Sequence, residues 1–147
     1  MSRTLAVLIG VGAGCLVGMQ APINSRLGKT VGGVQAASFS FLVGTFALVS
    51  LAFILRGGLG SLGHVGRVPW WALVGGLLGA VYVFVALEAV HTLGASGLTA
   101  VVILGQLAIS VAIDRFGLLG VAKQAVGVQR ILGLVLLAAG VVLVVRK

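Results

Sequence analysis

The sequence is short of acidic residues and of cysteine, and both shortages exclude classes of function. Its 147 residues include two acids and one cysteine. A lone cysteine, Cys15, excludes an internal disulfide and a cysteine-based metal cluster. No group of His, Cys and carboxylate residues has metal-ligand spacing, no glycine-rich phosphate loop follows a strand, and no nucleophile has a visible base. We therefore expect no enzyme, no cofactor and no metal site.

Hydrophobic residues make up most of what is present. They account for 60% of the chain, against 8% charged residues, which is far from the composition of soluble domains. The formal charge of +8 would suggest nucleic acid in a soluble protein. Here the cations flank apolar runs, and no basic stripe alternates with aromatic residues. We interpret the chain as an integral membrane protein whose surroundings are the lipid bilayer, with no nucleic-acid partner.

The uncharged runs predict the membrane spans. Four of them can each cross a hydrocarbon core of ~30 Å; they are Thr4–Ser25, Thr30–Leu55, Val68–Leu87 and Thr92–Ile113. A fifth run, Ile131–Val145, is long enough only if its helix begins near Gln124 and Arg130 snorkels toward the headgroups. We predict an all-α fold with one transmembrane domain over 1–147. Its five helices are expected at about 4–25, 32–55, 70–91, 95–114 and 125–145.

The basic residues are shared almost evenly between the two sides of such a protein. One side would hold Arg3, Arg56, Arg67, Arg115, Lys123 and Arg130. The other would hold Arg26, Lys29, Arg146 and Lys147. Because orientation follows the excess of Lys and Arg in short loops, this small difference is a weak signal, and insertion in both orientations is expected. A second, inverted copy could then supply the two-fold pseudosymmetry that a single five-helix unit lacks.

Glycines recur at spacings that allow helices to approach closely. Examples are Gly10 with Gly14 and Gly18, Gly75 with Gly79, and Gly133 with Gly140. In lipid, such small-residue seams replace the hydrophobic effect in bringing helices together. The same glycines would also give clearance for sliding or for a solute.

Polar side chains inside the spans are the first functional candidates, because a polar group in hydrocarbon is costly without a partner. Gln20 and Asn24 lie one turn apart on the first helix, with Pro22 between them loosening the turn. They would either bond a neighbouring helix or contact a solute. Tyr82, near the middle of the third helix, would either close a pocket beside glycines or pack in the core.

The fourth helix carries a polar stripe. Thr99, Gln106, Ser110 and Asp114 recur at steps of seven, four and four, with Gln106 near mid-membrane. The stripe would line a cavity for a polar organic solute or bond a neighbouring helix. Its last member, Asp114, is expected to form a charge pair with Arg115 at the end of the helix.

Glu88 lies toward the end of the third helix, one turn before His91. It is a candidate proton-coupling residue, because partial burial would favour proton exchange. The structural alternative is a Glu88–His91 pair near the headgroups.

Motifs spread over most of the chain carry a resemblance to a known family. They are Gln20 with Asn24, Trp70-Trp71, Leu93-Gly94-Ala95, Gly105-Gln106-Leu107, Ser110, Asp114-Arg115-Phe116-Gly117-Leu118, Gly120, and Arg130 with Gly133 and Gly140. In this ordered set the sequence resembles the YdcZ-type branch of the drug/metabolite transporter superfamily. The resemblance implies a five-helix protein of the bacterial inner membrane that works as an antiparallel pair, either a dual-topology homodimer or two inverted paralogues.

The resemblance also implies kinship with the four-helix small multidrug exporters, which exchange protons for organic cations through an acid in the first helix. This chain has Gln20 and no acid in its first helix. Proton antiport on an acid at that place therefore does not carry over to this sequence.

Our leading hypothesis is a secondary transporter for a small organic metabolite or drug-like solute that works by alternating access. Solute contact is assigned to Gln106, Ser110, Gln20, Asn24 and Tyr82, and proton coupling to Glu88. A small dual-topology ion channel and a membrane assembly subunit without transport remain the alternatives. The absence of charged rings and filter-like carbonyl motifs favours the carrier over the channel.

Overall fold

The structure is a computed structural model that describes residues 1–146, so Lys147 of the predicted basic tail lies outside the described residues. The described chain is built from helices and connecting segments and contains no strand. It divides into two compact units, Met1–His91 and the part that begins at Thr92. Four of its segments are long and apolar enough to cross a membrane.

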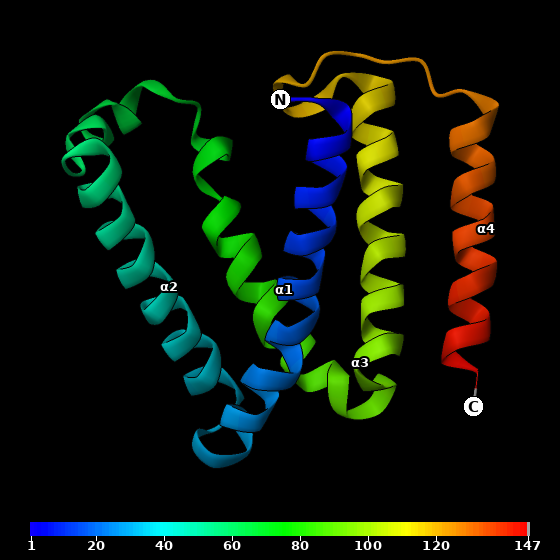
Figure 1. The fold of residues 1–147 in the computed structure, drawn as a ribbon, viewed down its shortest axis with the longest axis horizontal. Coiled ribbons are helices and arrows are strands. Elements are labelled where there is room, and N and C mark those ends of the chain that lie inside the picture. Colours follow the sequence, from blue (N-terminus) through cyan, green and yellow to red (C-terminus); the bar gives the residue numbers. More distant parts are fainter. Residues whose placement is uncertain (147) are drawn as a thin grey trace. The chain divides into compact units, whose positions relative to one another are not determined.

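The first unit begins with two long helices that contact each other. Helix α1 spans Arg3–Val31, and the Ser2 hydroxyl caps it by accepting a hydrogen bond of 3.2 Å from the Leu5 backbone N–H. Gly32, with φ +93°, then allows the chain to reverse directly into α2, Gly33–Arg56 (Figure 1). The α1–α2 connection is therefore a single glycine.

The first helix is longer than predicted. It was expected to end near residue 25, with Arg26 and Lys29 in a loop, but both side chains lie on the last two turns of α1. The helix also continues through Pro22 without interruption. No residue between 25 and 31 forces the helix to stop, and long basic side chains can reach the headgroup layer from a helix end.

Two short 3-10 helices, η1 (Gly60–Arg67) and η2 (Trp70–Leu73), connect α2 to α3, Gly75–Phe116. Pro69 directly precedes η2. The third helix was predicted to start at residue 70, but residues 70–73 form η2 and the α-helix starts at Gly75. A straight helix of 42 residues would be about 63 Å long, twice the hydrocarbon thickness. Its helical geometry is interrupted at Gly94, whose φ of +70° and ψ of 170° are available only to glycine.

The second unit contains the rest of α3, a connecting segment and α4, Val128–Val145. The connection has a short 3-10 helix η3, Leu118–Gly120, followed by residues 121–127 without helix. The fifth predicted helix was expected to start near residue 125 and starts three residues later. Its 18 residues measure about 27 Å, close to the hydrocarbon thickness.

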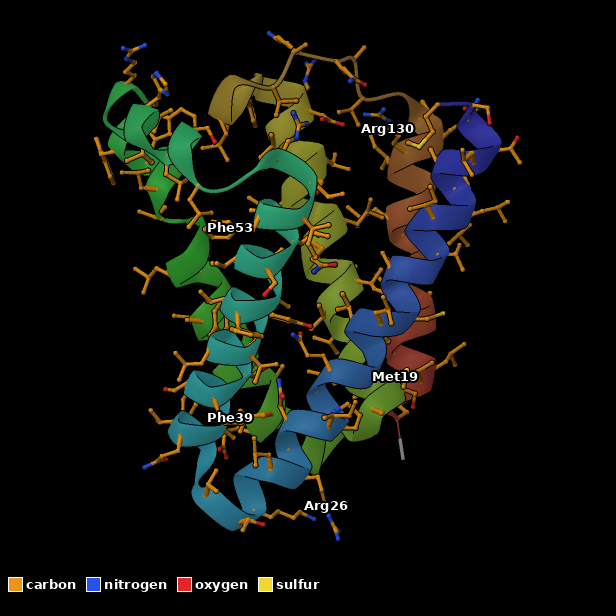
Figure 2. All side chains as sticks on the ribbon, turned by 60° about the vertical axis from the view of Figure 1, so that its left-hand side comes forward. Met19, Arg26, Phe39, Phe53 and Arg130 are labelled. Carbon is orange, nitrogen blue, oxygen red and sulfur yellow. The ribbon has the colours of Figure 1, made fainter. Side chains whose placement is uncertain are left out.

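Large apolar side chains lie mostly on the outside of the helices. Met19, Phe39 and Phe53 are between 57% and 59% exposed and project from α1 and α2 (Figure 2). The buried cluster of the first unit is small and consists of Ala36, Ala37, Val83 and Leu87. Soluble proteins bury such side chains, whereas a protein surrounded by lipid is expected to expose them.

Replacing Gly94 with Ala should lower the free energy of unfolding by about 1–3 kcal/mol, because alanine does not adopt this backbone conformation without strain. The measurement is denaturant unfolding in detergent micelles. Gly105→Ala is the matched control, since Gly105 is helical and its Cβ would also meet open space. Equal effects of the two substitutions would contradict the assignment of a strained break at Gly94.

Candidate functional site

A small hollow with three polar side chains in its wall lies between α1 and α2 in the first unit. It has a volume of about 180 Å³, and Gln20, Ser40 and Thr45 are its polar lining residues. None of these three side chains is engaged in a hydrogen bond within the described residues. The hollow, which we name the Gln20 hollow, therefore offers one amide and two hydroxyl groups to a solute.

Asn24 lies one turn beyond Gln20 on the same helix. The two residues line a second hollow of about 360 Å³ whose other walls are apolar. Asn24 is only 6% exposed, and its Nδ2 is buried without a hydrogen-bond partner in the described chain. A buried donor without a partner lowers stability by about 1–3 kcal/mol. Asn24 therefore has a polar group that a solute or a second chain could satisfy.

The neighbouring residue, Ser25, connects α1 to α3. Its Oγ and the Nε2 of His91 share a hydrogen bond of 3.0 Å. No hydrogen bond or ion pair joins Glu88 to His91 within the described residues, so the expected alternative of a Glu88–His91 pair is wrong. Glu88 instead lies beside the start of α2, where a Cβ added to Gly33 would collide with its Oε1. The N-terminal end of a helix favours a carboxylate at that place.

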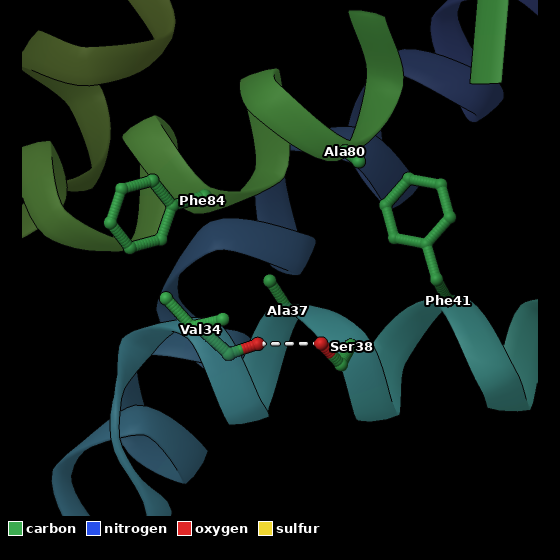
Figure 3. A pocket seen from close by; sticks show the side chains of 6 residues that line it. All are labelled: Val34, Ala37, Ser38, Phe41, Ala80 and Phe84. Atoms are coloured by element: carbon green, nitrogen blue, oxygen red, sulfur yellow. Dashed lines mark hydrogen bonds between the residues drawn. The ribbon is translucent and has the colours of Figure 1, made fainter. Parts of the chain in front are cut away.

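Tyr82 packs against the buried cluster of the first unit and is half-buried. Near it is an apolar hollow of about 340 Å³ between α2 and α3 (Figure 3). Ser38 lines this hollow, but its hydroxyl donates to the Val34 carbonyl at 2.9 Å and is already satisfied. Phe41 and Phe84 supply the aromatic walls, so the hollow suits apolar material better than a polar solute.

In the second unit, Gln106 and Ser110 lie one turn apart on α3 and are both exposed. Neither makes a hydrogen bond within the described residues. Thr99, the first member of the predicted stripe, donates to the Ala95 carbonyl at 2.9 Å. Gln106 and Ser110 are thus the members of the predicted stripe whose polar groups are available to a partner or a solute.

Arg130 joins the start of α4 to the end of α3. Its guanidinium donates to Asp114 Oδ2 at 2.8 Å and to Gln124 Oε1 at 3.0 Å. The expected Asp114–Arg115 pair is therefore wrong. Consecutive helical residues point about 100° apart, so Asp114 faces Arg130 while Arg115 faces elsewhere. The backbone N–H of Gln124 also donates to the Asp114 carbonyl, at 2.8 Å, which holds this segment out of the helix.

Sequence reasoning missed Ser40, Thr45 and Ser25. Ser40 and Thr45 are five residues apart on α2, which places them about 140° apart around the helix axis, so no same-face spacing marks them in the sequence. The bond between Ser25 and His91 spans 66 residues and has no local signal in the sequence.

Taken together, the polar groups of both units can recognise neutral hydrogen-bond donors and acceptors. Within the described residues no group of three metal-ligating side chains is present.

Comparison with known proteins decides the family. Residues 5–143 match the family described as "Putative inner membrane exporter, YdcZ". The chain belongs to the YdcZ family. The family is part of the drug/metabolite transporter superfamily, as the sequence motifs predicted. Its apolar helices and this membership make the chain a multi-pass protein of the inner membrane.

A full-length relative supports the membership. The chain is 34% identical to "Inner membrane protein YdcZ" of Escherichia coli (strain K12) over 147 residues, which cover 99% of this chain and 97% of the relative. No solved structure matches the chain. The YdcZ family is described as an exporter family and not as an enzyme family.

A double-mutant cycle tests the ion pair that defines the second unit. Asp114→Asn and Arg130→Gln should show a coupling of about 0.5 kcal/mol in the free energy of unfolding, a modest value because the two side chains are 28% and 44% exposed. The matched cycle of Asp114→Asn with Arg115→Gln should show none. Coupling in the second cycle and not in the first would contradict the observed pairing.

Proposed function

We propose that the protein is a secondary carrier that moves a small organic solute across the inner membrane by alternating access. The YdcZ family match over residues 5–143 is the observation that carries this proposal. The polar groups of Gln20, Ser40, Thr45 and Gln106, unengaged within the described chain, support it. Such groups inside apolar helices are costly unless they contact a partner or a solute.

We infer five membrane crossings, with α3 contributing two. The segment Trp70–Phe116 has 47 residues, about twice what one crossing needs. Its break at Gly94 leaves roughly 20 residues on each side, enough for one crossing each. Five crossings would place the two ends of the chain on opposite sides of the membrane.

The working assembly is an antiparallel dimer of identical chains or of inverted paralogues. The near-equal division of basic residues supports insertion in both orientations. Open glycine seams support close contact with another chain, since a Cβ at Gly10, Gly14 or Gly18 would meet no atom of the same chain within 4 Å. In this assembly we assign solute contact to Gln20, Asn24 and Tyr82 of the first unit and, separately, to Gln106 and Ser110 of the second.

A dual-topology ion channel is the second candidate. The open glycine seams and the near-equal division of basic residues are as compatible with a channel as with a carrier. The two functions differ in kinetics. A carrier saturates and supports exchange of labelled for unlabelled solute, whereas a channel passes unitary currents.

Gln106→Ala should reduce saturable transport about tenfold, because loss of one hydrogen bond to a desolvated solute removes about 1–3 kcal/mol. The measurement uses liposomes and solid-supported-membrane currents with guanidinium compounds, quaternary ammoniums, nucleobases and amino acids. Gln35→Ala, an exposed glutamine at the start of α2, is the matched control. The assignment fails if Gln106→Ala transports at the wild-type rate with equal dimer content.

Glu88→Gln should abolish transport driven by a pH gradient and leave solute exchange intact, since a glutamine cannot carry the proton. The other acid provides the control, because Asp114 is held in an ion pair with Arg130 and Asp114→Asn should keep the response to the gradient. Gradient-driven uptake by Glu88→Gln at the wild-type level would remove Glu88 from the coupling mechanism.

A further inference from the structure

A fourth hollow lies in the second unit, between the end of α3, the segment that follows it and the start of α4. Its volume is about 510 Å³. Seven of its eight lining residues are apolar: Ala108, Val111, Ala112, Phe116, Ala125, Val126 and Ile131. The eighth is Arg115, and we name this cavity the Arg115 hollow. Ala108, Val111, Ala112 and Arg115 share one face of α3, so an apolar wall ends in a single guanidinium.

The charges around the Arg115 hollow are not balanced within the unit. Asp114 is the only acidic residue after Glu88, and it is engaged by Arg130. Arg115 is exposed and has no ion-pair partner among the described residues. Lys123 adds a second cation nearby, because its Cβ lies 3.2 Å from the Cβ position of Gly117, two residues after Arg115. The hollow therefore combines apolar walls with uncompensated positive charge.

Arg115 lies where a membrane-spanning α3 would reach the headgroup layer. It occupies the last turn of α3, which ends at Phe116, and the chain then leaves the helix. Apolar side chains one and two turns earlier on the same face lie where acyl chains would pass. Basic pockets at the ends of neighbouring membrane helices bind the headgroups of anionic lipids.

We propose that the Arg115 hollow binds an anionic phospholipid, with the Arg115 guanidinium on the phosphate and the start of an acyl chain against Ala108, Ala112 and Ile131. Lys123 adds attraction at the rim. A guanidinium matches a phosphate with two parallel hydrogen bonds. A zwitterionic lipid would bind less well, because its own ammonium group already compensates the phosphate. The inference does not depend on the transport function.

Native mass spectrometry of the purified full chain tests the proposal. The protein in nonionic detergent is offered an equimolar mixture of phosphatidylglycerol and phosphatidylcholine with identical acyl chains. The wild type should retain the anionic lipid preferentially. Arg115→Gln should lower the ratio of retained anionic to zwitterionic lipid about fivefold, the factor expected for one basic residue at an anionic surface. Arg115→Lys should keep most of the preference.

Controls separate this site from general attraction to a basic protein. Arg56→Gln removes an exposed cation at the end of α2 that does not line the hollow, and it should leave the ratio unchanged. Ala112→Phe should reduce retention of both lipids by filling the apolar wall. An excess of inorganic phosphate should not displace the lipid, because phosphate alone gains nothing from that wall.

Three results would overturn the proposal. Equal retention of the two lipids by the wild type would show no preference for negative charge, and an unchanged ratio in Arg115→Gln would place the preference elsewhere. Loss of the dimer in Arg115→Gln without a change in the lipid ratio would mean that Arg115 pairs with an acid of a second chain.

Discussion

The bilayer interior contains no water to bond exposed peptide groups, and this constraint shapes every element of the protein. Each N–H and C=O at membrane depth must find its partner within a helix. The described chain accordingly contains helices and short connections, and α1 passes directly into α2 through one glycine. Outside the two longer connections, irregular backbone lies at Gly32 and Gly94, where it requires a residue without a side chain. Glycine therefore sets where the helices of this chain change course.

Lipid as solvent also explains which parts of the fold were predictable. Uncharged runs located the helices because length and composition suffice for that. Their ends were less accurate, since the ends depend on interactions that composition does not contain. Residues 26–31 stay helical because nothing stops them before Gly32. The start of α4 is displaced to Val128 because Gln124 is bonded to the Asp114 carbonyl and to the Arg130 guanidinium.

The positions of the polar residues were also predictable only in part. Single-helix spacing correctly placed Gln20 near Asn24, and Gln106 near Ser110, on common faces. Contacts between helices could not be obtained in this way. Ser25 with His91, Glu88 beside Gly33, and Asp114 with Arg130 each join residues far apart in sequence. For Asp114 the expected partner was the next residue, Arg115, which helix geometry directs to a different side. For Glu88 the expected partner was His91, which is bonded to Ser25 instead.

The Asp114–Arg130 pair has a consequence for biosynthesis. The two residues are separated by 16 positions, so Asp114 is added to the chain roughly one to three seconds before Arg130 and leaves the ribosome ahead of it. Until Arg130 also emerges, Asp114 at the end of α3 has no ion-pair partner, and the following segment is still free to move. Emergence of Arg130 closes the connection and fixes the start of α4. The start of the last helix is thereby held by Asp114, a residue that is synthesised before that helix.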